Sequence, residues 1–370
     1  MKKFFKILLT VIAVIAAAVA IVWGRELKTI ASVHQVGENN CLYEMEYTAG
    51  YDLDKLVEAD IDGNKDLVQY VVGTLTKGIP VNLESKKDEG EHCTSFQVKN
   101  ADGGWLYGRN YDYYKSPTLV VHSHPKDGYA SLAVCDLSHL GYTPEKLPVD
   151  FKSKLLCIAS VYAPMDGINE KGLCTSIMAL PKQAARQNTG KHIAGTSILM
   201  RLWLDRCATV DEALDLLETV DVRHDAEAGS GYHYMVADAN GDCAVVEFDL
   251  FDGWKTMITR KQSDSSYMHV TNHLLAPKYY TTEPDPVLGN PHSKSWWRYD
   301  TVKKYLEEHS GVLNVAEAQE CLASVHWKDL VWENGMVEDT QYSNVYDQTA
   351  LTLRLRPWND YDHTYVFELK

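Results

Sequence analysis

The chain of 370 residues lacks several features that would assign it to a common class. None of its eight cysteines belongs to a C-x-x-C pair, which excludes a zinc ribbon and a thioredoxin-type motif. Basic residues are scarce, with 36 Lys and Arg against 51 Asp and Glu, and they form no basic cluster. The net charge of −15 therefore argues against nucleic acid as a partner. No internal repeat is present, and a composition of 45% hydrophobic and 24% charged residues is typical of a folded globular protein.

The first 24 residues have the pattern of a leader. Three lysines within the first six residues precede an uncharged run over residues 7–23. As a helix this run is about 25 Å long, slightly short of the roughly 30 Å hydrocarbon core of a bilayer. We expect residues 1–24 to be a membrane anchor or, alternatively, a signal peptide cleaved at the small residues 18–20. Either places the body of the protein outside the cytoplasm, membrane-anchored or secreted.

Residues 25–92 form a distinct acidic segment. Residues 52–75 have helical periodicity, whereas residues 84–92 are charged and poor in core residues, as in a linker or a processing site. We therefore expect residues 25–92 to be a propeptide-like segment and residues 93–370 to form the main domain.

From Cys93 onward the chain alternates between predicted strands and helices. A hairpin over residues 93–111, with its turn at 100–104, comes first. Further strands are predicted at 117–123, 130–135, 173–179, 231–237, 242–248, 253–259, 267–271, 343–347, 349–355 and 364–369, and helices at 193–206, 209–219, 298–309 and 314–325. This order predicts an α+β fold of four layers, in which helices cover two stacked antiparallel sheets.

Cys93 begins a predicted strand directly after the charged stretch. If the chain were cut between His92 and Cys93, the thiol would lie beside a free α-amine with a pKa of about 8. One residue would then supply both the nucleophile and the general base. Pairing in the hairpin would bring Arg109 and Asp112 to this end of the strand, where Arg109 could favour the thiolate and Asp112 could hold the amine. A structural ion pair is the alternative interpretation of these two residues.

The segment Cys93-Thr-Ser-Phe, followed by Arg109 and Asp112, resembles the start of the N-terminal nucleophile (Ntn) hydrolases of the choloylglycine hydrolase type. This group includes bile salt hydrolases, penicillin V acylases, acid ceramidase and the isopenicillin N acyltransferases. Four further segments are similar to the family, namely residues 166–173, 234–247, 269–273 and 340–346.

The resemblance implies an αββα sandwich whose nucleophile is exposed by autocatalytic cleavage, here between His92 and Cys93. It also implies hydrolysis or transfer of the acyl group of a linear, non-peptide amide, without a cofactor or a metal. The residues that match the family's catalytic set are Cys93 as nucleophile, Arg109, Asp112, Asn272 as the oxyanion-hole asparagine, and Arg298 as the late arginine.

The chain departs from the bile salt hydrolases at one position. Ala179 stands where those enzymes have a second asparagine, so one amide donor is missing, although a backbone N–H could replace it. This departure argues against a bile salt substrate more than against an amide substrate in general. Four residues are candidates for the wall of the pocket, with core packing as the alternative for both tryptophans: His269, His273, Trp296 and Trp297.

We therefore expect an exported amidase that acts on a small-molecule N-acyl amide through an acyl-thioester. Three alternatives stay open: an acyltransferase that uses the same acyl-enzyme, a papain-like cysteine hydrolase in an uncut chain, and a non-catalytic exported binding protein. The sequence does not determine the acyl and amine groups, which include those of bile acid conjugates, N-acyl amino acids, ceramide-like lipids and β-lactams. It leaves the disulfide pairing and the oligomeric state open as well.

Overall fold

The computed structural model of the chain describes residues 21–38, 41–75, 77–78, 92–181, 184–225, 230–279, 294–331, 335 and 337–369. Residues 1–20 of the expected leader, and the expected processing segment except His92, lie outside them. Within the described ranges, no helix is both long enough and apolar enough to cross a membrane.

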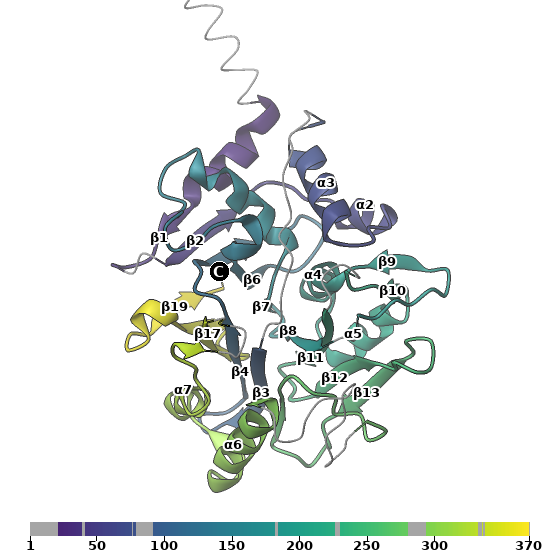
Figure 1. Cartoon of the computed structure of the whole chain (residues 1–370), viewed down its shortest axis with the longest axis vertical. Coiled ribbons are helices and arrows are strands. Elements are labelled where there is room, and N and C mark those ends of the chain that lie inside the picture. Colours follow the sequence, from purple (N-terminus) through teal and green to yellow (C-terminus); the bar gives the residue numbers. More distant parts are fainter. Residues whose placement is uncertain are drawn as a thin grey trace, which may run out of the picture.

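Two β-sheets form the centre of the molecule (Figure 1). Nine of the described strands form the first sheet, in the order β1-β2-β5-β6-β7-β8-β11-β12-β13. Eight form the second, in which β14-β3-β4-β17-β18-β19 are neighbours in that order. The remaining two strands of the second sheet, β15 and β16, pair with β3 and β17 respectively. The strands of the first sheet are β1 His34–Gln35, β2 Leu42–Tyr47, β5 Thr118–Ser123, β6 Ser131–Asp136, β7 Asp166–Asn169, β8 Cys174–Pro181, β11 Ser230–Ala237, β12 Cys243–Phe248 and β13 Thr256–Arg260. Those of the second are β3 His92–Asn100, β4 Trp105–Tyr113, β14 Tyr267–Val270, β15 Val312–Leu313, β16 Leu330–Val331, β17 Val337–Asp347, β18 Thr352–Pro357 and β19 Tyr365–Glu368.

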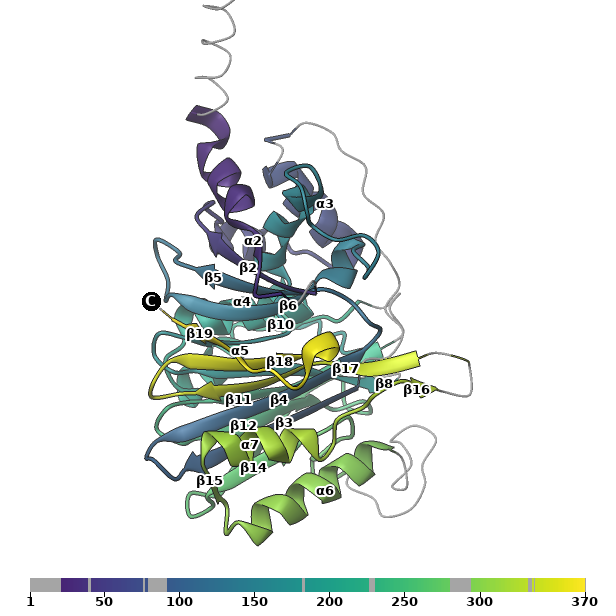
Figure 2. The ribbon, with the colours of Figure 1, turned by 90° about the vertical axis from the view of Figure 1, so that its left-hand side faces the viewer.

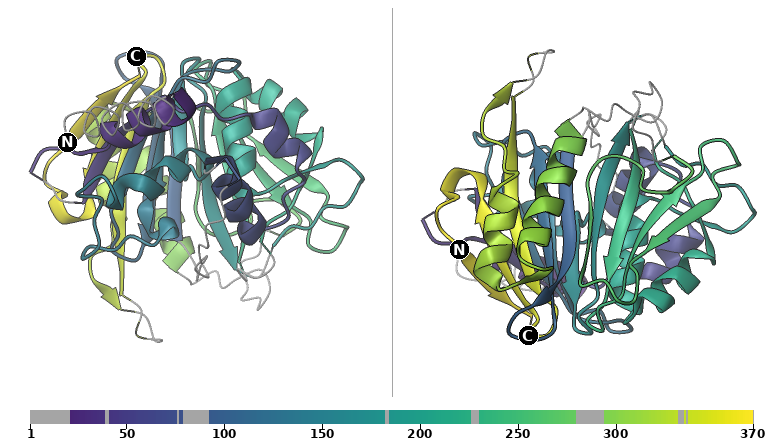
Figure 3. Two further views of the ribbon diagram at one scale, coloured as in Figure 1. Left: turned by 90° about the horizontal axis from the view of Figure 1, so that it is seen from above. Right: turned by 90° about the horizontal axis from the view of Figure 1, so that it is seen from below.

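Helices cover the outer faces of both sheets, so the predicted four-layer sandwich is confirmed (Figure 3). The second sheet is covered by α6 and α7, and the first by α4 and α5, with α2 and α3 near them. The helices are α2 Leu53–Glu58, α3 Asn64–Leu75, α4 Thr196–Arg206, α5 Val210–Leu217, α6 Lys294–Glu308 and α7 Val315–Ala323. Shorter elements are the 3-10 helices Leu137–Leu140, Ser153–Tyr162 and Trp358–Asp360 and the parallel pair β9 His192–Ala194 and β10 Val220–Val222.

The alternation of side chains along β3 decides where Cys93 points. Phe96 and Val98 belong to the apolar cluster with α6 and α7, whereas Ser95 bonds Ser176 of the first sheet. Because successive side chains of a strand point to opposite faces, Cys93 shares the face of Ser95. Its side chain therefore lies between the two sheets, in the large central core.

The predicted hairpin is confirmed. Strands β3 and β4 pair antiparallel from His92↔Asp112 to Lys99↔Trp105, and two glycines with positive φ form the turn. A further glycine permits close packing between the strands, because a Cβ on Gly108 would lie 2.3 Å from the Phe96 ring.

The helical stretch expected over residues 52–75 is present, but it forms two helices, α2 and α3, instead of one. Between them the backbone at Asp60 (φ 48°) and Gly63 (φ 118°) is left-handed. A left-handed residue ends an α-helix, and the apolar periodicity of the sequence continues across this break without revealing it.

The acidic N-terminal segment is part of the first sheet. Strand β2 pairs in parallel with β5, from Leu42↔Thr118 to Tyr47↔Ser123, and has no counterpart among the predicted strands. Beyond β2, the carboxylate of Asp62 bonds both Arg186 and Arg223. Figure 2 shows this segment at the end of the molecule where the N-terminal helix lies.

We expect cleavage before Cys93 to leave two fragments that remain associated. Burial of one large apolar side chain stabilises by about 1.5–3 kcal/mol, and Leu42, Met45 and Leu56 are completely buried. Size-exclusion chromatography of the cleaved protein should therefore give one peak with both fragments, which separate only in denaturant. Recovery of the C-terminal fragment alone in native buffer would contradict this expectation.

Candidate active site

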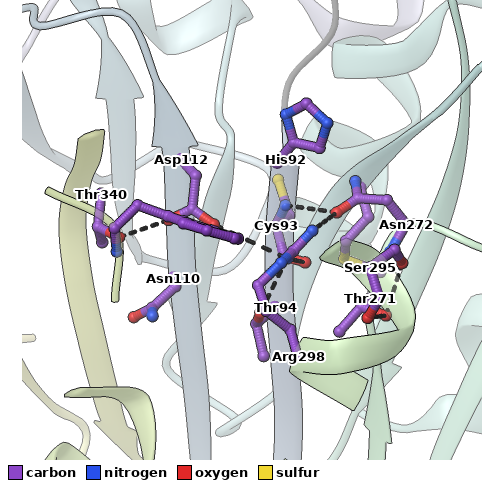
Figure 4. A network of polar contacts seen from close by, with 12 residues as sticks. His92, Cys93, Thr94, Asn110, Asp112, Thr271, Asn272, Ser295, Arg298 and Thr340 are labelled. Atoms are coloured by element: carbon purple, nitrogen blue, oxygen red, sulfur yellow. Dashed lines mark hydrogen bonds and ion pairs between the residues drawn. The ribbon is translucent and has the colours of Figure 1, made fainter. Parts of the chain in front are cut away.

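The backbone of Cys93 is held on both sides (Figure 4). Its N–H donates to Oδ1 of Asn272 at 2.6 Å, and its carbonyl accepts a hydrogen bond from Nη1 of Arg298. Cys93 itself is fully buried. The structure thus brings together three residues that lie far apart in the sequence, around the bond at which cleavage is expected.

Asn272 follows β14 and is fixed from two directions. Its backbone N–H donates to Oγ of Ser295 at 2.9 Å, and its Nδ2 donates to the carbonyl of Ala179 at 2.8 Å. Position 179, where the sequence has alanine in place of the second asparagine, therefore orients Asn272 through its backbone carbonyl. An amide nitrogen carries two N–H groups, and the second one is the candidate oxyanion donor.

Arg298 extends from α6 into the same site. Besides the carbonyl of Cys93, it bonds Oγ1 of Thr94 at 3.0 Å and Oδ1 of Asn272 at 2.7 Å. Its Nη1 also lies 3.7 Å from Oδ2 of Asp112. Burial lowers the pKa of the guanidinium, while the Asp112 carboxylate opposes this effect.

Asp112 lies opposite His92 on the neighbouring strand. Its Oδ1 accepts a hydrogen bond from Oγ1 of Thr340 at 2.6 Å. Burial raises the pKa of this carboxyl, the charge of Arg298 lowers it and that of Glu338 raises it, and the result is a pKa of about 7. Around neutral pH, Asp112 can therefore exchange a proton with its surroundings.

We expect the substitution Asp112→Asn to remove a pH-dependent loss of stability. The folded carboxyl has a pKa of about 7, against an ordinary value of 3.8. Between these two pH values the folded chain therefore retains a proton that the unfolded chain releases. The free energy of unfolding should thus fall as the pH rises from about 4 to 7. The loss is on the order of 1.4 kcal/mol per pH unit of the window.

Urea denaturation of the uncut Cys93→Ala chain, with and without Asp112→Asn, measures this contribution. Other titrating groups are common to both proteins, so only the difference between their pH profiles counts. Parallel profiles would show that Asp112 titrates at an ordinary pKa.

Arg109 is a buried cation near Cys93. Its Nε lies 3.8 Å from Oδ2 of Asp166, and its guanidinium makes no hydrogen bond within the described residues. Burial lowers its pKa, but the charges of Cys93, Tyr342 and Asp166 outweigh burial and leave the pKa raised. A fixed positive charge of this kind favours a neighbouring thiolate.

Asp166 in turn is held by the second sheet. It accepts hydrogen bonds from the hydroxyls of Tyr342 and Tyr346 and from Nδ2 of Asn344. Strand β17 thus fixes the carboxylate that faces Arg109 from the other sheet.

The four expected pocket residues lie around α6. His273 stacks on Trp296, with ring centroids 3.9 Å apart, and its Nδ1 is 2.9 Å from Oγ of Ser295. His269 packs on Tyr299 at 4.0 Å. These contacts support the elements that carry Asn272 and Arg298, whereas Trp297 is 49% exposed.

Burial lowers the pKa of both histidines to about 3. His269 and His273 are therefore neutral at physiological pH and act as packing and hydrogen-bonding groups rather than as cations.

Several contacts of the site have no counterpart in the sequence-based prediction. Thr340 and Ser295 form hydrogen bonds with Asp112 and Asn272, and Asp166 forms an ion pair with Arg109. The sequence marks only the segments 166–173 and 340–346. The resemblance to the family marked those segments, but only the tertiary contacts identify the side chains. In the described part of the chain, no group of His, Cys, Asp and Glu side chains could hold a metal ion.

The stacked sheets, with a cysteine at the start of a central strand, define the class: the fold is that of the Ntn hydrolases. The sequence profile of the acyl-coenzyme A:6-aminopenicillanic acid acyl-transferase family matches residues 98–356. The chain belongs to this family. The matched region begins after Cys93 and contains Arg109, Asp112, Asn272 and Arg298.

Two solved structures have the same fold. One is a variant of the conjugated bile acid hydrolase from Clostridium perfringens, with 16% identity and a TM-score of 0.54, covering 75% of this chain and 92% of that one. The other is penicillin V acylase from Agrobacterium tumefaciens, with 17% identity and a TM-score of 0.51, covering 74% and 85%. No curated protein sequence matches the chain. The predicted resemblance to the Ntn hydrolases is thus confirmed for fold and family.

Proposed function

We propose that the protein is an amidase that hydrolyses the C–N bond of a linear N-acyl amide, with Cys93 as an N-terminal nucleophile. The observation that carries the proposal is the position of Cys93, whose N–H and carbonyl are bonded by Asn272 and Arg298 between two stacked sheets. In an uncut chain these contacts hold the peptide bond before Cys93 in a defined geometry.

The first step of the proposed mechanism is self-cleavage. Sγ of Cys93 attacks the carbonyl carbon of His92, the C–N bond breaks, and the thiol proton passes to the nitrogen that becomes the α-amine. Water then hydrolyses the thioester, which leaves a carboxylate on His92 and restores the thiol. The position of Asp112 opposite His92 supports a role in holding the new amine.

The mature site would repeat this chemistry on a substrate. The α-amine takes the thiol proton, and the thiolate attacks the amide carbonyl. The second N–H of Asn272 stabilises the oxyanion, and the α-ammonium protonates the leaving amine. Water releases the acyl group from the resulting thioester, while the charge of Arg109 favours the thiolate in each cycle.

An acyltransferase is the second candidate function, because the description of the family is that of an acyl-transferase. It requires only that an amine replace water in the last step. The papain-like alternative loses its support, since the fold is that of the Ntn hydrolases.

For localisation, the leader pattern of residues 1–24 supports the proposal that the protein is exported and remains membrane-anchored or is secreted. Fractionation of cells into cytoplasm, membrane and exterior tests this independently of activity. Recovery of the uncut leader in the cytoplasm would contradict it.

N-terminal sequencing of active protein, followed by a screen of N-acyl amides, tests the main proposal. We expect a chain that begins at Cys93 and releases amine from at least one amide class. Adding an acceptor amine separates the two candidate functions, because a transferase forms new amide faster than free acid. Full activity of an uncut chain would refute the proposal.

A further inference from the structure

His92, the residue before the expected cleavage site, contacts a buried carboxylate with its side chain. Glu338 lies on β17 and is completely buried, and its Oε1 is 2.9 Å from Nδ1 of His92. Glu338 precedes Thr340, which bonds Asp112, by two positions on the same strand. His92 itself pairs with Asp112 on the neighbouring strand.

The surroundings of the His92 imidazole are suited to a hydrogen-bond donor or a cation. Oδ2 of Asp112, fully buried, accepts no hydrogen bond from the described residues. Carboxylates attract hydrogen-bond donors and cations.

Self-cleavage and turnover place an acyl group on the same sulfur. In self-cleavage, the thioester on Sγ of Cys93 carries His92 as its acyl group. In turnover, the substrate acyl group takes that place. In the proposed mechanism both carbonyls face the same donor on Asn272, so both acyl groups leave the thioester carbon in the same direction. The space that the His92 side chain occupies beside Glu338 is then the space that the first atoms of the substrate's acyl group enter.

We propose that the space occupied by the His92 side chain in the uncut chain becomes the acyl subsite of the mature enzyme. The subsite takes an acyl group with a hydrogen-bond donor, preferentially a cation, that reaches the Glu338 carboxylate. This inference rests on the proposed function and adds the chemical class of the acyl group to it.

Residue 92 allows a test within the chain, because its side chain is the acyl substituent during self-cleavage. We expect His92→Lys to cleave at a rate close to that of wild type, and His92→Leu to cleave about tenfold to a hundredfold more slowly, the usual effect of losing a polar contact with a charged group. In a Glu338→Gln background, the difference between His92→Lys and His92→Leu should shrink to less than threefold. The rates are measured by intact mass after rapid dilution from denaturant.

The outcomes separate the two proposals. Equal cleavage of the His92→Lys and His92→Leu variants would overturn the acyl subsite and leave the role of Cys93 intact. An uncut wild-type chain that is fully active would remove the proposed function and the subsite together. If Glu338→Gln does not fold, as judged by its melting curve, the comparison of the two His92 variants alone still decides, because His92 is partly exposed and tolerates substitution.

Two matched anilide substrates test the acyl subsite during catalytic turnover. The γ-aminobutyryl group places its nitrogen as many bonds from the carbonyl carbon as Nδ1 of His92, and the pentanoyl group replaces that nitrogen with a methyl carbon. We expect wild type to prefer γ-aminobutyryl anilide about tenfold or more in kcat/KM, and Glu338→Gln to lose most of this preference. An equal rate for both anilides, or a preference for pentanoyl anilide, would overturn the proposal.

Discussion

The substitution Cys93→Ala is expected to leave a single chain that is uncut between residues 92 and 93 and has no amidase activity. Without the sulfur, neither the attack on the His92 carbonyl nor the attack on a substrate can occur. Wild-type protein should instead show two fragments that meet between residues 92 and 93. Intact mass spectrometry and an amine-release assay measure the two effects separately.

The matched control for this experiment is Cys174→Ala. Cys174 is likewise completely buried, but it lies on β8 and burial raises its pKa well above the ordinary value. This variant should cleave itself and turn over substrate, with a loss confined to stability. Cleavage or turnover by the Cys93→Ala chain would show that another residue is the nucleophile.

The second large effect is expected for Asn272→Ala, which should lower kcat by about a hundredfold to a thousandfold. Loss of one oxyanion donor has an effect of this size in other acyl-transfer enzymes. In this protein the same side chain also accepts hydrogen bonds from the Cys93 N–H and from Arg298, so self-cleavage should slow as well. Single-turnover kinetics of acylation measure the chemical step directly.

A lower stability could mimic this result, so the control is Asn314→Ala. Asn314 caps α7 with a full capping box far from Cys93 in the sequence, and loss of such a cap costs about 1 kcal/mol. We expect this variant to melt earlier and to keep its kcat. An Asn272→Ala enzyme with near wild-type kcat would exclude Asn272 as the oxyanion donor.

The architecture shows how the uncut chain holds the proposed cleavage site. Cys93 stands near the start of a central strand, where the hydrogen bonds of the sheet fix its backbone on the β4 side. Asn272 and Arg298 fix it from the side of β14 and α6. The contacts that orient the bond before Cys93 are thus also the contacts that the mature site would use on a substrate.

The local features of the fold could be predicted from the sequence because they depend on neighbouring residues. Alternating apolar residues and the glycine turn predict the hairpin over residues 93–111, and the hairpin in turn predicts that Asp112 lies near Cys93. The same reasoning failed for residues 52–75, because apolar periodicity does not report the left-handed backbone at Asp60 and Gly63. It also missed β2, whose partner β5 is supplied by a distant segment.

The sequence by itself therefore determined most of the longer strands and helices after Cys93, the hairpin that begins with Cys93, and, through the resemblance, the class of the fold. Only the tertiary structure decided which side chains surround Cys93. Asn272, in the segment after β14, and Arg298, on α6, lie more than 170 positions from Cys93. Thr340 and Glu338 of β17 contact its neighbours Asp112 and His92. Their meeting depends on which strands pair and on how α6 packs against the sheet, and these are non-local contacts that no local pattern encodes.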